Sequence, residues 1–115
     1  MSRAQRRNVR KKVSEAIVVS NAINGESMGR IGNLSIDGMM LIGTQAFHEE
    51  YYYQFQFTLN CRAQAPQRVE VGVQCLWAEQ ARTGRSFWGG FKVIDLSEGD
   101  MKIMNVWIGE QAEEA

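Results

Sequence analysis

The sequence predicts an all-β fold, namely a six-stranded antiparallel β-barrel with a C-terminal α-helix and a flexible basic arm at the N-terminus. Three observations lead to this prediction. From residue 15 onward, apolar and polar residues alternate with a period of two, as they do in a strand with one buried face. The alternating runs are short and joined by short connections, which is typical of an antiparallel barrel or sandwich. Helical spacing of apolar residues is found only near the C-terminus.

The 115 residues are expected to form one domain, because two cores would leave each with too little surface to bury. We divide the chain into a basic arm at 1–13, the barrel with its helix at 14–109, and an acidic tail at 110–115. No stretch of 18 apolar residues and no signal peptide is present, so the expected compartment is the cytoplasm. The two cysteines, Cys61 and Cys75, are therefore expected to be buried free thiols.

The first half of the chain contains three of the predicted strands. A strand begins at 16–19, a turn region follows at 25–28, and the second strand covers 29–35. Asp37-Gly38 is a dipeptide typical of a type I′ hairpin turn. Residues 39–42 are therefore predicted to return antiparallel to the second strand.

The second half contains the three longest predicted strands, at 51–59, 68–79 and 87–94. In the first of these, alternation places the large apolar side chains on one face: Tyr51, Tyr53, Phe55, Phe57 and Leu59. In the next strand the same argument gives a second apolar face: Val69, Val71, Val73, Cys75 and Trp77. Both faces have the pattern of a strand that is buried on one side.

One helix is predicted at the C-terminus, where it would lie across one end of the barrel and close it. Ser97 is a good N-cap, and Asp100 stands three residues later, at the position that a capping box uses. The apolar stripe that follows has helical spacing and consists of Met101, Met104 and Ile108, widened by Ile103 and Trp107.

The sequence offers little for catalysis or for metal binding. The one histidine, His48, stands in a polar loop beside Glu49 and Glu50, where a surface position is expected. His48, Cys61 and Cys75 lack the spacing of metal ligands, and no nucleophile or phosphate-loop motif is present. We therefore expect no catalytic residue, no metal and no cofactor, and we interpret the chain as a non-enzyme.

The charges are distributed unevenly, although 13 basic and 13 acidic residues give a net charge of zero. Six basic residues lie within the first dozen positions, with no acidic residue among them: Arg3, Arg6, Arg7, Arg10, Lys11 and Lys12. Arg6 and Arg10 form an RxxxR motif with Arg7 inside it, and Arg3 with Arg7 satisfies the same spacing. Guanidinium groups bind phosphate in a bidentate manner, stack on purines and pair with the O6/N7 edge of guanine. An anionic ligand is one interpretation, and a solvated arm without a partner is the other.

The segment from Asn33 to Gly38 matches a second motif, [D/N]xSxxG. Strand alternation would place Asn33 and Ser35 on one face, where their oxygens can contact a polar ligand. Gly38 would let a ligand approach the backbone closely. A plain hairpin with outward polar residues explains the same segment.

Taken together, the two motifs and the all-β pattern resemble the PilZ family of cyclic di-GMP receptors. The resemblance spans nearly the whole chain and includes Leu76-Trp77 and the final strand and helix from residue 90 onward. It implies a ligand-binding set made of Arg6, Arg7, Arg10, Asn33, Ser35, Gly38 and Trp77. Trp77 also fits a core position, and both placements stay open. Asn33 stands where Asp is more frequent, which implies weaker hydrogen bonding to guanine.

The resemblance implies an adaptor that binds one cyclic di-GMP molecule or an intercalated pair, orders its basic arm and signals to an unidentified downstream protein. Motility, biofilm formation, exopolysaccharide production and virulence are the processes that it would control. Two alternatives remain. One is a ligand-free interaction module of the same fold, of the type IV pilus kind. The other is an RNA or single-stranded DNA binder with Tyr52 as a stacking group, although nucleic acid is the less favoured partner.

Overall fold

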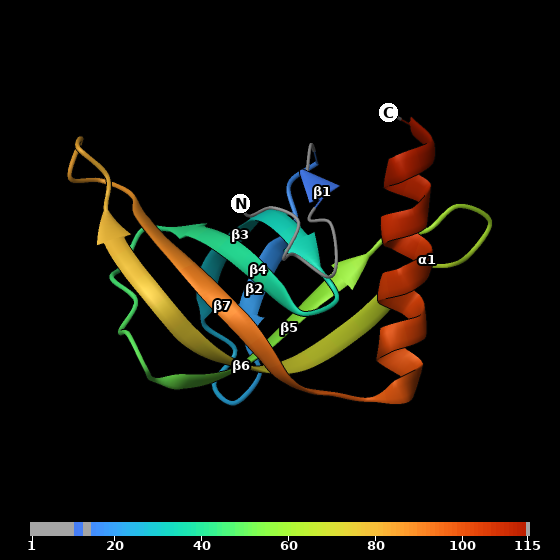
Figure 1. Cartoon of the computed structure of the whole chain (residues 1–115), viewed down its shortest axis with the longest axis horizontal. Coiled ribbons are helices and arrows are strands. Elements are labelled where there is room, and N and C mark those ends of the chain that lie inside the picture. The colour runs from blue at the N-terminus through green and yellow to red at the C-terminus, as the bar shows by residue number, and fades with distance from the viewer. Residues whose placement is uncertain (1–10, 13–14, 115) are drawn as a thin grey trace, which may run out of the picture.

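The computed structural model describes residues 11–12 and 15–114 and contains strands followed by a single helix (Figure 1). In chain order the elements are β1 (Lys11–Lys12), β2 (Val18–Asn21), β3 (Ser27–Ser35), β4 (Gly38–Gly43), β5 (Tyr52–Leu59), β6 (Gln67–Gln80), β7 (Phe87–Leu96) and α1 (Glu98–Glu114). The predicted strands are confirmed with small shifts at their ends. No end shifts by more than two residues; β2 is displaced by two residues as a whole, and β3 begins at Ser27, inside the predicted turn region.

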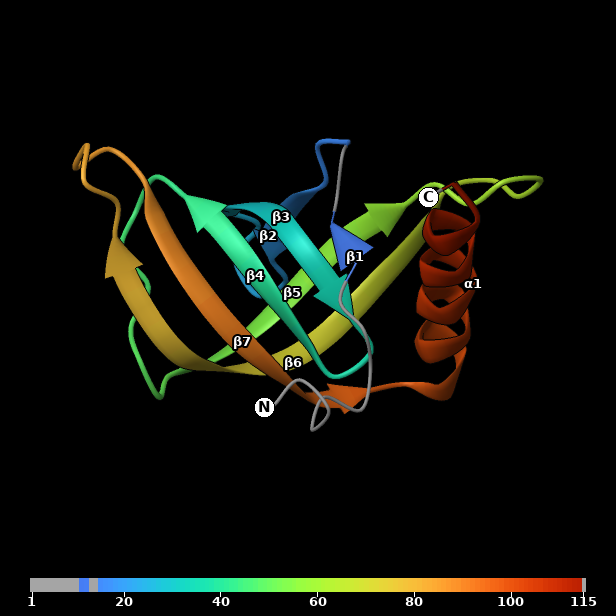
Figure 2. The same ribbon diagram turned by 45° about the horizontal axis from the view of Figure 1, so that its top comes forward.

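The six longer strands close into an antiparallel barrel with the order β3-β2-β5-β6-β7-β4, and β4 pairs back onto β3. The predicted six-stranded barrel is therefore confirmed. β1 lies outside this ring and pairs with the second half of β3, through Lys11 opposite Leu34 and Lys12 opposite Asn33. β2 pairs with the first half of the same edge of β3, as the tilted view shows (Figure 2). Two residues that the sequence assigned to the flexible arm thus have defined backbone partners.

Apolar side chains from every long strand fill the interior of the barrel, because alternate residues of each strand point inward. An aromatic cluster occupies its centre, where the Phe91 ring meets Phe55 edge to face with centroids 5.1 Å apart. Phe47 and Tyr53 contact Phe91 in the same manner. Of the apolar face predicted for 51–59, only the first member lies outside this core, because Tyr51 precedes β5 and is exposed.

Helix α1 stands at one end of the barrel, as predicted (Figure 1). Met104 and Trp107 are fully buried, whereas Met101 is 37% exposed and lies at the margin of the stripe. The Ser97 hydroxyl accepts a hydrogen bond from the Asp100 N–H at 3.1 Å, which confirms the N-cap. The Asp100 carboxylate accepts from the Glu70 N–H of β6 at 3.1 Å, so it joins the helix to the barrel and does not complete a capping box.

Helix α1 continues through Glu114, so most of the segment described as an acidic tail at 110–115 is helical. The Glu110 carboxylate accepts hydrogen bonds from the Arg62 N–H at 3.0 and 3.1 Å, which fixes this part of the helix against the β5–β6 connection. Within the described part of the chain, no helix is long and apolar enough to cross a membrane.

Candidate ligand-binding surface

The β3–β4 hairpin carries the [D/N]xSxxG motif, and Ser35 holds its turn together. The two turn residues are Ile36 and Asp37, because Ser35 and Gly38 are the last paired residues. Ser35 is fully buried, and its hydroxyl lies 2.7 Å from the Asp37 carboxylate and 3.2 Å from the Gly38 carbonyl. Since a hydroxyl donates one proton, the shorter bond to the charged oxygen is the stronger of the two.

The predicted type I′ turn over Asp37-Gly38 is wrong. The turn lies one residue earlier, and within residues 15–114 the only non-glycine residues with positive φ are Glu50 and Ala63. A type I′ turn needs positive φ at both central residues, which Ile36 would adopt only at a steric cost. The buried Ser35 hydroxyl bonds to the turn and favours this register.

Asn33 and Ser35 do not occupy equivalent positions, although alternation places them on one face. The register of β3 against β4 is irregular between Ile31 and Asn33, and Leu34 is fully buried next to the buried Ser35. Asn33 itself is partly exposed. Of the two motif residues, Asn33 is therefore the one at the barrel surface, and Ser35 shapes the turn beneath it.

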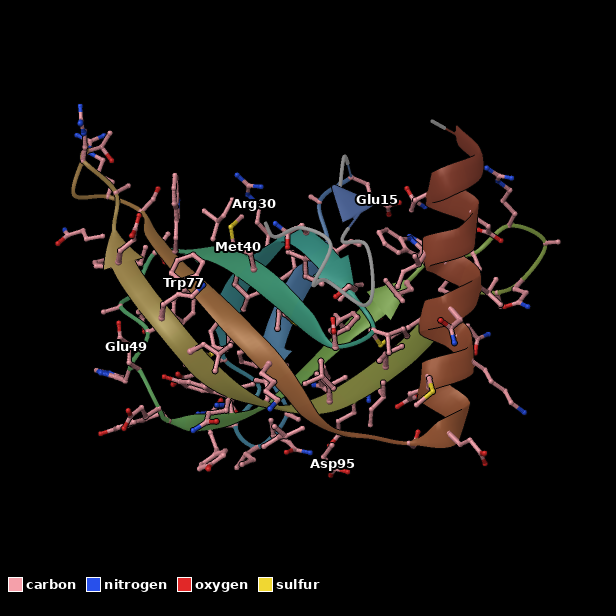
Figure 3. The ribbon with its side chains drawn as sticks, in the orientation of Figure 1. Glu15, Arg30, Met40, Glu49, Trp77 and Asp95 are labelled. Carbon is pink, nitrogen blue, oxygen red and sulfur yellow. The ribbon has the colours of Figure 1, made fainter. Side chains whose placement is uncertain are left out.

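Trp77 lies on the outside of the barrel, so the core placement is excluded. The register of β6 against β7 is irregular between Cys75 and Trp77, which rotates Trp77 off the inward-facing series that ends with the fully buried Cys75. Trp77 is 38% exposed and pairs with Gly90 of β7. Its ring lies across β7 (Figure 3), and a Cβ atom at Gly90 would collide with the indole Nε1.

One cross-strand row joins the two motif positions on the outside of the barrel. Trp77 pairs with Gly90, Gly90 with Met40, Met40 with Asn33, and Asn33 with Lys12. We name these five residues the Trp77 row. With strands spaced by about 4.8 Å, the row spans roughly 19 Å across five strands. Figure 3 shows the Met40 and Trp77 side chains on the same side of β4 and β7.

The Trp77 row contains residues that sequence reasoning missed. Met40 and Gly90 belong to it only through strand pairing, which no single-sequence motif reveals. Lys92, which lies outside the row, was missed as well; it is exposed on β7 directly opposite Gly38 of the motif. It supplies a cation next to the hairpin, and nothing in its sequence surroundings distinguishes it from other surface lysines.

The predicted arginines Arg6, Arg7 and Arg10 lie outside the described residues. What the structure does describe is the chain directly after them, where Lys11 and Lys12 pair with β3 beside Asn33. The RxxxR segment is thus joined by chain connectivity to one end of the Trp77 row.

The histidine and the two cysteines show no arrangement for metal binding or nucleophilic chemistry within the described residues. Among residues 15–111, no cluster of three potential metal ligands is found. The His48 ring is exposed and packs against Tyr51, with centroids 5.0 Å apart. Cys61 and Cys75 are both buried and free, and burial raises the pKa of each thiol. A buried thiol with a raised pKa is a poor nucleophile.

The fold has several counterparts among solved structures. In sequence, neither a family model nor a curated protein matches the chain. In structure, the PilZ domain of YcgR from Escherichia coli with c-di-GMP matches with a TM-score of 0.70 at 13% identity, covering 96% of this chain and 93% of that one. The longer E. coli YcgR chain in complex with c-di-GMP matches with a TM-score of 0.71 at 13% identity, covering 96% of this chain and 47% of that one.

The Bacillus subtilis inhibitor of motility, MotI/DgrA, matches with a TM-score of 0.76 at 12% identity, covering 99% of this chain and 54% of that one. The chain therefore spans about half the length of MotI/DgrA and of the longer YcgR chain. The PilZ fold that the sequence resemblance implied is confirmed over nearly the whole chain.

Proposed function

We propose that the chain is a receptor for cyclic di-GMP that binds the nucleotide on the outside of the barrel, along the Trp77 row. The observation that carries the proposal is the row itself. It places Asn33 of one motif and Trp77 of another on one exposed surface, with the end of the basic segment paired alongside. One of the structurally similar proteins, E. coli YcgR, is described with c-di-GMP both as its PilZ domain and as the longer chain, which supports this choice of ligand.

Each proposed contact follows from the chemistry of its side chain. The amide oxygen of Asn33 accepts from the N1–H and 2-amino groups of guanine. The exposed Trp77 ring offers a stacking surface, and base–aromatic stacking contributes about 1–3 kcal/mol per base. Arg6 and Arg10, with Arg7 beside them, bind the phosphates and the O6/N7 edge of guanine. Ser35 and Gly38 act indirectly, by fixing the hairpin that presents Asn33.

The proposed output is a change of surface and not a reaction. Binding orders the basic segment over the ligand, and part of the interaction energy is spent on that ordering. The ordered segment then presents a new surface to a downstream protein. The roles of such an adaptor in motility, biofilm formation, exopolysaccharide production or virulence belong to this proposal.

The test is a calorimetric titration of cyclic di-GMP into the wild-type chain, an Arg6→Ala/Arg10→Ala variant and an Arg3→Ala/Arg7→Ala variant. We expect micromolar or tighter binding by the wild type. The Arg6→Ala/Arg10→Ala variant should lose more affinity than the Arg3→Ala/Arg7→Ala variant. Arg82→Ala/Arg85→Ala is the matched control, because it removes two exposed arginines from the β6–β7 loop, at the end of the barrel opposite α1. No heat of binding by the wild type would overturn the receptor proposal.

The same samples distinguish the alternatives. A nucleic-acid binder would bind oligonucleotides of any sequence, with an affinity that falls steeply as salt is raised. A ligand-free interaction module would bind neither cyclic di-GMP nor oligonucleotides. A receptor retains its preference for cyclic di-GMP when an excess of unrelated single-stranded RNA is present.

A further inference from the structure

A second cross-strand row runs beside the Trp77 row on the same outer surface. Val18 of β2 pairs with Arg30, Arg30 with Ile42, Ile42 with Trp88, and Trp88 with Glu79 of β6. We name these five residues the Trp88 row. Every member is exposed or partly exposed, so the row faces outward along its whole length.

The two rows form one continuous surface. Trp77 is paired with Gly90, and Trp88 precedes Gly90 by two residues on β7, so the tryptophans are diagonal neighbours across β6 and β7. Diagonal neighbours lie about 7–8 Å apart, within reach of aromatic side chains. Trp77 and Trp88 are exposed to similar extents, at 38% and 40%. Figure 3 shows Arg30 on the same side of the barrel as Met40 and Trp77.

The other end of the Trp88 row carries a cation next to a groove. A shallow groove of about 350 Å³ opens beside Arg30, with Ile42, Gly43 and Ser86 in its lining. No hydrogen bond or ion pair joins the exposed Arg30 side chain to another residue in 15–114. A guanidinium group in this situation is available for a phosphate or for the O6/N7 edge of guanine.

We propose that Arg30, Ile42 and Trp88 form a second purine-nucleotide subsite beside the Trp77 row. The base stacks on Trp88, and its apolar contact extends over Ile42. Arg30 binds the phosphate or the outer edge of the base. The Glu79 carboxylate at the far end repels phosphate, so the phosphate lies toward Arg30 and the base toward β6 and β7. The inference rests on the proposed function, because the nucleotide that it places here is cyclic di-GMP.

The tryptophans themselves provide the first test. Replacing Trp77 by Phe keeps an aromatic ring in the Trp77 row and leaves Trp88 as the only exposed tryptophan, since Trp107 is fully buried. We expect cyclic di-GMP to quench the fluorescence of the Trp77→Phe variant and to leave that of a Trp77→Phe/Trp88→Phe variant unchanged. If calorimetry shows binding but the Trp77→Phe variant is not quenched, or if both variants are quenched equally, the subsite proposal is wrong.

The second test measures affinity. Arg30→Ala is expected to weaken cyclic di-GMP binding about ten- to a hundredfold, which is the effect of losing one charge-assisted contact. Arg68→Ala is the matched control, because it removes an exposed arginine from the other end of β6. Binding by Arg30→Ala within twofold of the wild type would contradict the subsite while leaving the receptor proposal intact. Absence of binding by the wild type itself would overturn both proposals.

Discussion

Trp77 of β6 lies against the backbone of Gly90 of β7, its cross-strand partner. The missing side chain at Gly90 is what allows the indole to lie flat on the barrel. The position of Trp77, a candidate ligand contact, therefore depends on Gly90, a residue that has no side chain with which to contact a ligand.

Replacing Gly90 by Ala is expected to displace Trp77, because the added Cβ would collide with the indole. The free energy of unfolding should fall by about 1–3 kcal/mol, as in other small-to-large changes in packed regions. Affinity for cyclic di-GMP should fall with it. Urea denaturation and calorimetry measure the two effects, and an unchanged affinity would show that the placement of Trp77 is not needed for binding.

Replacing Gly109 by Ala is the opposite case and serves as a control for the Gly90 variant. Gly109 is exposed within α1, and an added Cβ would have no neighbour within 4 Å. Alanine has the higher helix propensity, so the free energy of unfolding should rise by about 0.5–1 kcal/mol. Ligand affinity should stay at the wild-type value. A decrease in stability in urea denaturation would contradict the packing described for this face of the helix.

Replacing Ser35 by Ala removes the hydroxyl that bonds to Asp37 and Gly38. We expect a loss of about 1–3 kcal/mol, since the bond to Asp37 involves a charged acceptor and the site is buried. An Asp37→Asn variant, which keeps an acceptor but removes its charge, should lose less. Equal stabilities of the Ser35→Ala variant and the wild type would mean that the hydroxyl does not hold the turn.

The buried thiols predict a loss of stability in alkaline solution. Burial raises the pKa of Cys61 and Cys75 from the ordinary value of 9.0, with the Glu110 carboxylate adding to the effect at Cys61. The folded state therefore holds these protons more tightly than the unfolded state. Stability is fully present below the unfolded pKa and falls as the pH rises toward the folded pKa. Burial also raises the pKa of Tyr53 from its ordinary value of 10.0, so the folded state loses further stability as the pH rises above that value.

A Cys61→Ala/Cys75→Ala variant provides the comparison for this pH dependence. Its free energy of unfolding should decrease less steeply than that of the wild type across pH 9.0, although its absolute stability is lower because of the cavities. Identical slopes would show that the thiols titrate alike in both states. In the wild type, iodoacetamide should react slowly with both thiols until the protein unfolds.

The strands and the helix could be predicted from the sequence because their signals are local. Alternation identifies a strand without knowledge of its partner, and Ser97 marks a helix start through its own side chain. The role of Asp100 was missed for the same reason. Its partner is the Glu70 N–H, thirty positions earlier in the chain, and no local pattern connects the two.

The candidate site was predictable only in part. Motif spacing identified Asn33 and Trp77, but alternation could not place Trp77 outside the barrel, because the irregular register after Cys75 is a property of the β6–β7 pairing. The neighbours Met40 and Gly90, and the whole Trp88 row, depend on which strands meet and in which register. These relationships arise from tertiary structure, and no pattern within a single sequence reveals them.

The closed ring of strands limits how a ligand could be sensed. Since β4 pairs with β3 as well as with β7, both edges of β3 are engaged and each of the six strands of the ring has a paired neighbour on both sides. A tightly packed ring of this kind resists continuous deformation. A nucleotide bound to its outer face would leave the backbone of the ring nearly unchanged, and a partner protein would have to recognise the occupied surface itself.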